Sequence, residues 1–154
     1  MAKTEITIHT DGCCLGNPGK GGFAAVVRRY QNGVEIKKRV VSDSAPETTN
    51  NQMELMAAIK GLRQIRRNEP AKITVFSDSE YVVLGMTGRL HKWQAKGWRT
   101  ASGQPVKNQD LWEALLTVSE GLDVKWQWVR GHSGDPFNEE ADAIANQAAT
   151  KRVR

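Results

Sequence analysis

Alternating apolar and polar residues predict five strands along the chain. Near the start, Ile6 and Ile8 alternate with polar neighbours, so we expect a strand that runs into Asp11. The same kind of pattern predicts further strands at Gly22–Tyr30, Val34–Val41, Lys72–Ser77 and Val124–Val129. Gln31-Asn32-Gly33 is typical of a hairpin turn between the second and third strands. The polar stretch Ser42–Glu47 is expected to be a connection.

Helical periodicity alternates with these strands. Polar residues from Thr48 to Asn51 are candidate caps for a helix from Gln52 to about Asn68, stopped by Pro70. A second helix starts at Tyr81–Leu84, and two more are predicted at Asp110–Gly121 and Asn138–Thr150. Strands mixed with helices in this way predict an α/β protein. We expect one domain over residues 1–150 and a short basic tail over 151–154.

Composition places the chain among folded proteins. Its 154 residues are 39% hydrophobic and 25% charged, with five Trp, which is enough to build a core. No apolar run approaches the ~20 residues of a membrane helix. The two cysteines are adjacent and poorly placed for a disulfide bond, so we expect reduced thiols and a cytoplasmic protein. With three separated His, a Cys/His zinc site is not expected.

Positive charge is concentrated in one stretch, Tyr81–Gln109, which we call the basic segment. It contains no Asp or Glu, and its five cations equal the whole net charge of +5. Trp93 and Trp98 are interleaved with these cations, which favours a surface that grips nucleic acid. The alternative is a solvated charged face whose two Trp residues serve packing.

Two carboxylates end predicted strands and two lie near helix starts. Asp11 and Asp78 follow apolar strands, while Glu54 and Asp142 have no cation at helical spacing. Three of the four have a structural alternative. Asp11 could cap a turn, Glu54 could be a first-turn residue that the helix dipole favours, and Asp78 could belong to a capping box over Ser77–Glu80. Strand ends and helix starts share one edge of an α/β sheet, so all four acids could line one cleft.

Four anions in one cleft repel unless metal is bound. Hard oxygen ligands select Mg²⁺ or Mn²⁺, and four carboxylates indicate a two-metal phosphoryl-transfer site. The Gly-rich loop after Asp11 matches neither a Walker A loop nor GxGxxG, so nucleotide binding is not favoured. His132 lies in a Gly-flanked loop, where a functional role is favoured over a core histidine.

The chain closely resembles type 1 ribonuclease H, the bacterial ribonuclease HI group. The matching stretches are TDGCCLGNPGKGG, TTNNQMELMAAI, FSDSEYV, W-x-x-x-GW-x-TA-x-x-x-PVKN-x-DLW and KWQWVRGHSG-x-P-x-NE-x-x-D, in family order over about residues 4–149. The resemblance implies a five-stranded mixed sheet, with three antiparallel and two parallel strands and helices on both faces. The chain departs from the family pattern at three positions. Glu80 replaces the Gln of well-known bacterial members, Glu47 stands where an Arg often supports the phosphate pocket, and Arg89 occupies a position that is Trp in some relatives.

The resemblance also implies an endonuclease that cuts the RNA strand of RNA–DNA hybrids, leaving 3′-hydroxyl and 5′-phosphate ends. It implies that the enzyme binds two Mg²⁺ ions when substrate is bound, with Mn²⁺ as a possible substitute. It also implies a monomer. The matched catalytic residues are Asp11, Glu54, Asp78, Asp142 and the mobile-loop His132, the four carboxylates being metal ligands. The matched RNA contacts are Cys14, Asn17, Asn50 and Asn51, and the matched DNA contacts are Thr49, Asn108, Lys92, Trp93, Lys96, Trp98 and Arg99.

Two other classes compete with this interpretation. A catalytically silent nucleic-acid-binding module on the same fold would be favoured by a missing carboxylate, and none is missing. A resolvase- or integrase-like nuclease shares the acidic site and the general fold. The asparagine-rich RNA-contact set and the basic segment argue against the second class.

Overall fold

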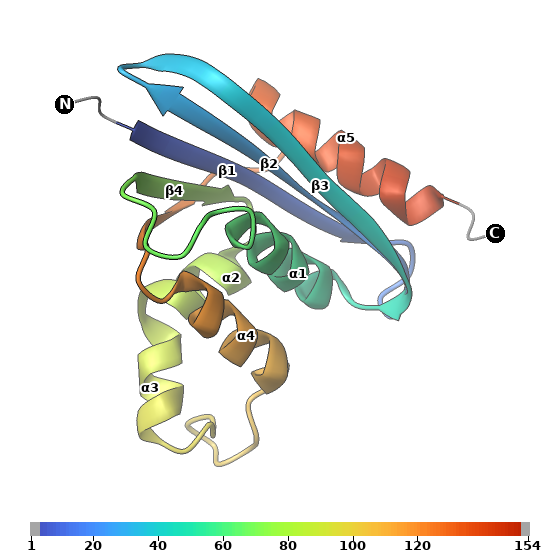
Figure 1. Ribbon diagram of the computed structural model, residues 1–154. Coiled ribbons are helices and arrows are strands. Elements are labelled where there is room, and N and C mark those ends of the chain that lie inside the picture. Colours follow the sequence, from blue (N-terminus) through green and yellow to red (C-terminus); the bar gives the residue numbers. More distant parts are fainter. Residues whose placement is uncertain (1–3, 152–154) are drawn as a thin grey trace.

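A central five-stranded sheet organises the chain in the computed structural model, which describes residues 4–151 (Figure 1). Its strands are β1 (Thr4–Cys14), β2 (Gly19–Gln31), β3 (Val34–Thr48), β4 (Lys72–Ser77) and β5 (Asp123–Trp128). They lie in the order β3-β2-β1-β4-β5. The first three form an antiparallel meander, whereas β4 pairs parallel with both β1 and β5. The predicted fold class is confirmed.

Helices cover both faces of this sheet. They are α1 (Asn50–Leu62), α2 (Glu80–Leu84), a π-helical turn η1 (Gly85–Arg89), α3 (Leu90–Ala95), α4 (Gln109–Ser119) and α5 (Pro136–Thr150). In Figure 1, α1 and α4 lie on one side of the sheet and α5 crosses the other. Within the described residues, no helix has the length and apolar character needed to cross a membrane.

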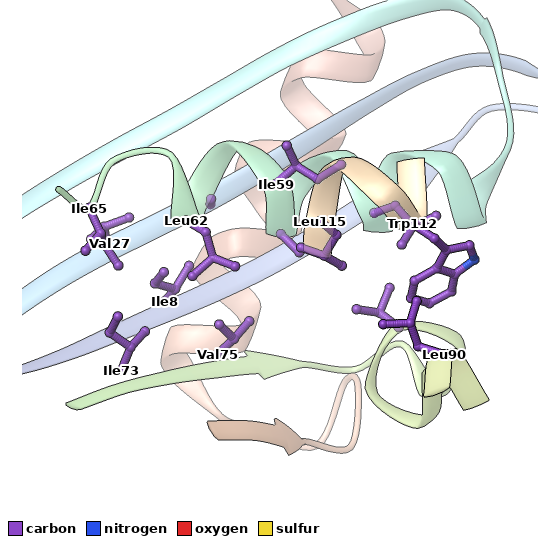
Figure 2. Close-up of a cluster of buried hydrophobic side chains, with 14 of the residues drawn as sticks. Ile8, Val27, Ile59, Leu62, Ile65, Ile73, Val75, Leu90, Trp112 and Leu115 are labelled. Carbon is purple, nitrogen blue, oxygen red and sulfur yellow. The ribbon is translucent and has the colours of Figure 1, made fainter. Parts of the chain in front are cut away.

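The main core fills the space between the sheet and α1 with α4. Ile8 and Val75 point from the strands toward Leu62 of α1 and Leu115 of α4, and all four are fully buried (Figure 2). Trp112 of α4 is also fully buried and extends this core toward the segment between β4 and α4. Burial of such large apolar side chains holds α1 and α4 against the strand ends, where the candidate site lies.

Three strands are longer than the sequence pattern predicts: β1, β3 and also β2, which spans Gly19–Gln31 where Gly22–Tyr30 was predicted. β1 continues past Asp11 to Cys14, because those last residues still pair with β2 up to Gly21. The predicted connection Ser42–Glu47 is wrong, since β3 continues through it to Thr48 opposite Gly19, with a register shift between the pairs Gly21–Ala45 and Gly19–Thr48. Most of β3 is exposed at the edge of the sheet, so its sequence lacks the alternation that a half-buried strand shows.

Helix α1 starts earlier and ends earlier than predicted. Thr49 is its cap: the Thr49 hydroxyl accepts a hydrogen bond from the Gln52 N–H, and the Gln52 side chain accepts one from the Thr49 N–H. This start places Glu54 in the second turn, and not in the first as expected. After Leu62 the chain leaves the helix in tight turns that bury Ile65 in the core.

The remaining predicted elements are found close to their expected places. β4 has the predicted bounds, and β5 and α4 each lie within one or two residues of the prediction. The terminal helix α5 begins at Pro136, capped by the Asp135 side chain. Of the predicted tail, residues 152–154 lie outside the described part of the chain.

Candidate active site

Asp11 and Asp78 lie side by side because of the strand register. The parallel pairing of β1 with β4 ends at Thr10 opposite Ser77, and each aspartate is the next residue along its own strand. The two carboxylates therefore emerge at the same edge of the sheet. Asp11 is buried at 4% exposure, and Asp78 is partly buried. The prediction that these two acids meet is confirmed by this geometry.

Glu54 is brought to the same place by a close contact between α1 and β1. The Gly12 N–H donates a hydrogen bond to Glu54 Oε1 at 3.1 Å and also contacts Asp11 Oδ1 at 2.9 Å. A side chain at position 12 would lie 2.5 Å from the backbone carbon of Met53, so only glycine allows this approach. Oxygens of Asp11, Glu54 and Asp78 all lie within 4.8 Å of one another.

Asp142 approaches from the other face of the sheet, on α5. This helix packs tightly on β2, since a side chain at Gly22 would lie 2.4 Å from the Ala149 nitrogen. The Asp142 carboxyl group lies close enough to Asp11 to help raise the pKa of that acid, and Asn146 donates to Asp142 Oδ1 at 3.3 Å. Asp142 is thus next to the group of three, though it is not part of the set that lies within 4.8 Å.

Burial and mutual repulsion raise the pKa of three of these acids. Burial, with the Asp142 and Asp78 carboxyl groups, raises the pKa of Asp11 from 3.8 to about 8. Burial and the Asp11 charge raise the pKa of Glu54 well above its usual range. Burial and Asp142 raise that of Asp78, while nearby His132 acts in the opposite direction. Without a cation, the cluster favours the protonated state.

The donor set fits a hard divalent cation. All of its side-chain atoms are carboxylate oxygens, the ligands that Mg²⁺ and Mn²⁺ prefer. Glu54 Oε2 is buried and has no hydrogen-bond partner within residues 4–151, although buried polar atoms are nearly always paired. A bound cation would supply the missing partner and would offset the repulsion that raises the pKa values.

His132 lies on the loop between β5 and α5, close to Asp78. It is exposed and has a left-handed backbone with φ of 54°. The loop contacts the site through Gly131, where a side chain would lie 2.9 Å from Asp78 Oδ2. The predicted loop position of His132 is found, and its exposure would let the imidazole reach a bound substrate.

The four residues that the resemblance matches to RNA contacts gather beside the cluster. The loop after β1 meets the start of α1 where the Asn50 N–H donates to Asn17 Oδ1 at 3.0 Å. Asn51 is the next, exposed residue of α1. Cys14 is less available than expected, because its thiol is within hydrogen-bond distance of the carbonyls of Gly16, Gly19 and Thr48.

The matched DNA contacts divide into a half-buried and an exposed group. Thr49 and Asn108 are linked through Gln52, whose Nε2 donates to Asn108 Oδ1 at 3.3 Å. The cations Lys92, Lys96 and Arg99 are exposed on α3 and the loop that follows, which stand away from the sheet in Figure 1.

The two Trp residues of the basic segment are not exposed platforms. The Trp93 ring packs edge-on against buried Trp112, with centroids 5.3 Å apart. Trp98 is partly buried against the same core. Packing, the alternative considered for these two residues, therefore buries most of each ring. The exposed surface of the basic segment is formed by its cations.

The sequence did not identify several residues that hold the carboxylates in position but are not themselves candidate metal ligands or proton carriers. Gly12 and Gly131 allow close approach to Glu54 and Asp78. Trp128 Nε1 donates to the Asp78 carbonyl at 3.2 Å and fixes the backbone there. A glycine directly after a candidate carboxylate within a strand was an available signal for Gly12. No sequence pattern indicated Trp128.

Fold and site together define a metal-dependent nuclease. The sequence profile of the RNase H family matches residues 3–150. Ribonuclease HI of Pseudomonas aeruginosa is 49% identical over 152 residues, covering 99% of this chain and 98% of that protein. Ribonuclease H of Bordetella pertussis is 48% identical over 143 residues, covering 93% and 88%.

Solved structures agree with these sequence matches. The crystal structure of LC9-RNase H1, a type 1 RNase H with the type 2 active-site motif, superposes with a TM-score of 0.85 at 35% identity, covering 96% of this chain and 72% of that one. The chain belongs to the RNase H family. It is an endoribonuclease that hydrolyses the RNA strand of RNA–DNA hybrids.

Proposed function

We propose that this hydrolysis uses two Mg²⁺ ions held by Asp11, Glu54, Asp78 and Asp142, and that it leaves 3′-hydroxyl and 5′-phosphate ends. The observation that carries the proposal is the group of Asp11, Glu54 and Asp78 oxygens within 4.8 Å of one another. The metal ions, once bound, would activate the attacking water and neutralise charge on the leaving 3′ oxygen, and Mn²⁺ could replace Mg²⁺.

The chain's own groups hold this arrangement in place. The Gly12 N–H binds Glu54 Oε1, while the buried Oε2 has no hydrogen-bond partner within residues 4–151. His132 is the candidate for proton transfer, because it is exposed on a loop beside Asp78 and does not belong to the carboxylate set. A neutral imidazole can accept a proton, and its protonated form can donate one to the leaving group.

The RNA strand is proposed to lie over the start of α1 and the loop after β1. Asn17, Asn50 and Asn51 offer amide donors and acceptors there, and the 2′-hydroxyl of RNA can use both. Cys14 shapes this loop through its thiol contacts. Amide groups that read the 2′-hydroxyl would distinguish RNA from DNA at the cleaved strand.

The DNA strand is proposed to lie along the start of α4 and the basic segment. Thr49 and Asn108 would contact one phosphate, and Lys92, Lys96 and Arg99 would contact others by charge. Trp93 and Trp98 would shape this surface from beneath, since both pack on the core. LC11-RNase H1, which shares the fold at a TM-score of 0.71, was crystallised in complex with an RNA/DNA hybrid.

We further propose a cytoplasmic monomer built as one domain over residues 1–150. Cys13 and Cys14 are free thiols, which supports a reducing compartment. All five strands join in one sheet with a continuous core, which supports a single domain. Sedimentation at micromolar concentration tests the monomer, and a dimer there would contradict it.

The proposed chemistry is tested by cleavage of three labelled duplexes. RNA–DNA hybrid, double-stranded RNA and double-stranded DNA are each incubated with Mg²⁺ and with chelator. We expect cleavage of the hybrid in Mg²⁺ alone, with products that a polymerase can extend from their 3′ ends and a ligase can join at their 5′ ends. Cleavage of the hybrid in chelator, or equal cleavage of double-stranded DNA, would overturn the proposal.

A further inference from the structure

Hydrogen bonds from α4 and from the residue just before it meet at the hydroxyl of Tyr81 on α2. Trp112 Nε1 donates to it at 3.1 Å, and Asn108 Nδ2 donates to it at 3.2 Å. The hydroxyl hydrogen in turn points to the Lys107 carbonyl, 3.5 Å away. Because Trp112 is fully buried and its ring lies 5.1 Å from that of Tyr81, the position of this hydroxyl is fixed by the core.

The side-chain amide of Asn108 is held at both ends by this arrangement. Its Nδ2 donates to Tyr81, and its Oδ1 accepts from Gln52 Nε2 at 3.3 Å. The Asn108 backbone is left-handed, with φ of 61°, at the position just before α4. One of the two N–H groups of Nδ2 has no partner within residues 4–151 and is free to bind a ligand.

Gln52 extends the chain of hydrogen bonds to the start of α1. Its Oε1 accepts from the Thr48 hydroxyl at 3.0 Å and from the Thr49 N–H at 3.2 Å. The start of α1, where RNA is proposed to bind, is therefore connected to the start of α4, where DNA is proposed to bind. Tyr81 joins this connection to the buried core.

We propose that Tyr81 is a positioning residue for the DNA strand: its hydroxyl orients the Asn108 amide so that one N–H remains directed to a DNA phosphate. This inference rests on the proposed function, because it assumes that Asn108 contacts DNA. Tyr81 itself touches neither the carboxylates nor the substrate. It acts through Asn108 alone.

Replacing Tyr81 with Phe removes the common acceptor and keeps the ring. The Asn108 amide is then free to rotate, so the phosphate contact is made less often. We expect KM for the hybrid to rise about 3- to 10-fold, the size expected for one lost hydrogen bond, with kcat kept within about 2-fold. The slope of log KM against log salt stays that of wild type, because no charge is removed.

A double-mutant cycle separates positioning from a structural effect. Tyr81→Phe is measured alone and in the background of Asn108→Gly, a substitution that suits the left-handed backbone. Tyr30→Phe, at the end of β2, is the matched control and keeps wild-type KM. Melting temperatures are recorded for all variants, because Tyr81→Phe also leaves the buried Trp112 N–H without its acceptor and lowers stability. Kinetics are run well below every melting temperature.

The outcomes are distinct. If Tyr81 acts through Asn108, Tyr81→Phe raises KM in the wild-type background and has no further effect in Asn108→Gly. Equal effects in both backgrounds, or a loss in kcat alone, would overturn the inference while wild-type hybrid cleavage still stands. If wild type failed to cleave the hybrid at all, the proposed function would fail first.

Discussion

The backbone N–H of Gly12 donates a hydrogen bond to Oε1 of Glu54 over 3.1 Å, which ties β1 directly to α1. This contact leaves the second Glu54 oxygen buried and unpaired within residues 4–151. The same N–H contacts Asp11. One glycine therefore sets the spacing between two of the proposed metal ligands.

Gly12→Ala tests this spacing. The added carbon would lie 2.5 Å from the Met53 backbone, so α1 must move away from β1 and take Glu54 with it. We expect kcat to fall at least 10-fold and the free energy of unfolding to fall by about 1–3 kcal/mol, the usual effect of overpacking. Gly88→Ala is the control, because its added carbon meets no atom within 4 Å. If Gly12→Ala were as active as the control, the claim that Gly12 sets the spacing between Asp11 and Glu54 would be wrong.

His132→Ala tests the loop histidine. General acid–base help is typically worth ~10²–10⁴-fold, so the variant should be slow but still active. Because His132 is exposed, added imidazole should reach its place and restore part of the lost rate. Single-turnover cleavage with saturating enzyme measures both effects. Unchanged turnover would remove His132 from the mechanism.

Neutralising Lys92, Lys96 and Arg99 together tests the basic segment. We expect KM to rise and its salt dependence to flatten, with kcat nearly intact, because fewer counterions are released on binding. The control replaces Lys60, in the last turn of α1, and Arg63 and Arg67, in the turns after it, by Gln and removes the same charge. A fall in kcat without a change in KM would mean that the segment shapes the active site and does not hold DNA.

Asp11→Asn tests the electrostatic strain of the carboxylate cluster. Burial and neighbouring acids raise the pKa of Asp11 from 3.8 to about 8. A carboxyl group with a raised folded pKa stabilises the fold below its unfolded pKa, and this stabilisation is lost as pH rises toward the folded value. Metal-free wild type should therefore lose stability as the pH rises from about 4, near the usual pKa of Asp, to about 8, the raised pKa of Asp11.

Thermal unfolding in chelator at several pH values measures this effect. Near pH 8, Asp11→Asn should melt above wild type, and the difference should shrink toward pH 4. Excess Mg²⁺ should raise the melting temperature of wild type more than that of the variant. Asp123→Asn, at the far end of the sheet where β5 begins, is the charge-matched control. A lower melting temperature for Asp11→Asn in chelator would make Asp11 a structural cap.

The sequence predicted both ends of β4 because burial alternates along that strand. β4 carries Ile73 and Val75 into the core between partly exposed neighbours, so its pattern marks both of its ends and places Asp78. β3 could not be predicted to its end, since it is an exposed edge strand and the polar stretch Ser42–Glu47 indicated a connection. Its last residues are fixed by pairing with β2, which is a non-local effect.

The candidate site was likewise predictable only where local sequence pattern determines it. Four carboxylates without local cations indicated a shared cleft, and the structure brings three of them within 4.8 Å and the fourth next to them. The supporting contacts of Gly12, Trp128 and Tyr81 join residues more than 25 positions apart in the chain. No periodicity encodes such contacts, because they arise only when helices and strands have packed.

Asp78→Asn most directly tests whether the carboxylates bind the catalytic metal. The substitution keeps the size of the side chain and removes one ligand charge, so hybrid binding should stay measurable while cleavage is nearly abolished. The measurement is kcat on a labelled RNA–DNA hybrid in Mg²⁺, with binding followed by fluorescence anisotropy and Asp123→Asn as control. We expect turnover below about a tenth of wild type, with a hybrid affinity close to it. If Asp78→Asn keeps more than about a tenth of wild-type turnover, the metal site proposed at this edge of the sheet is wrong.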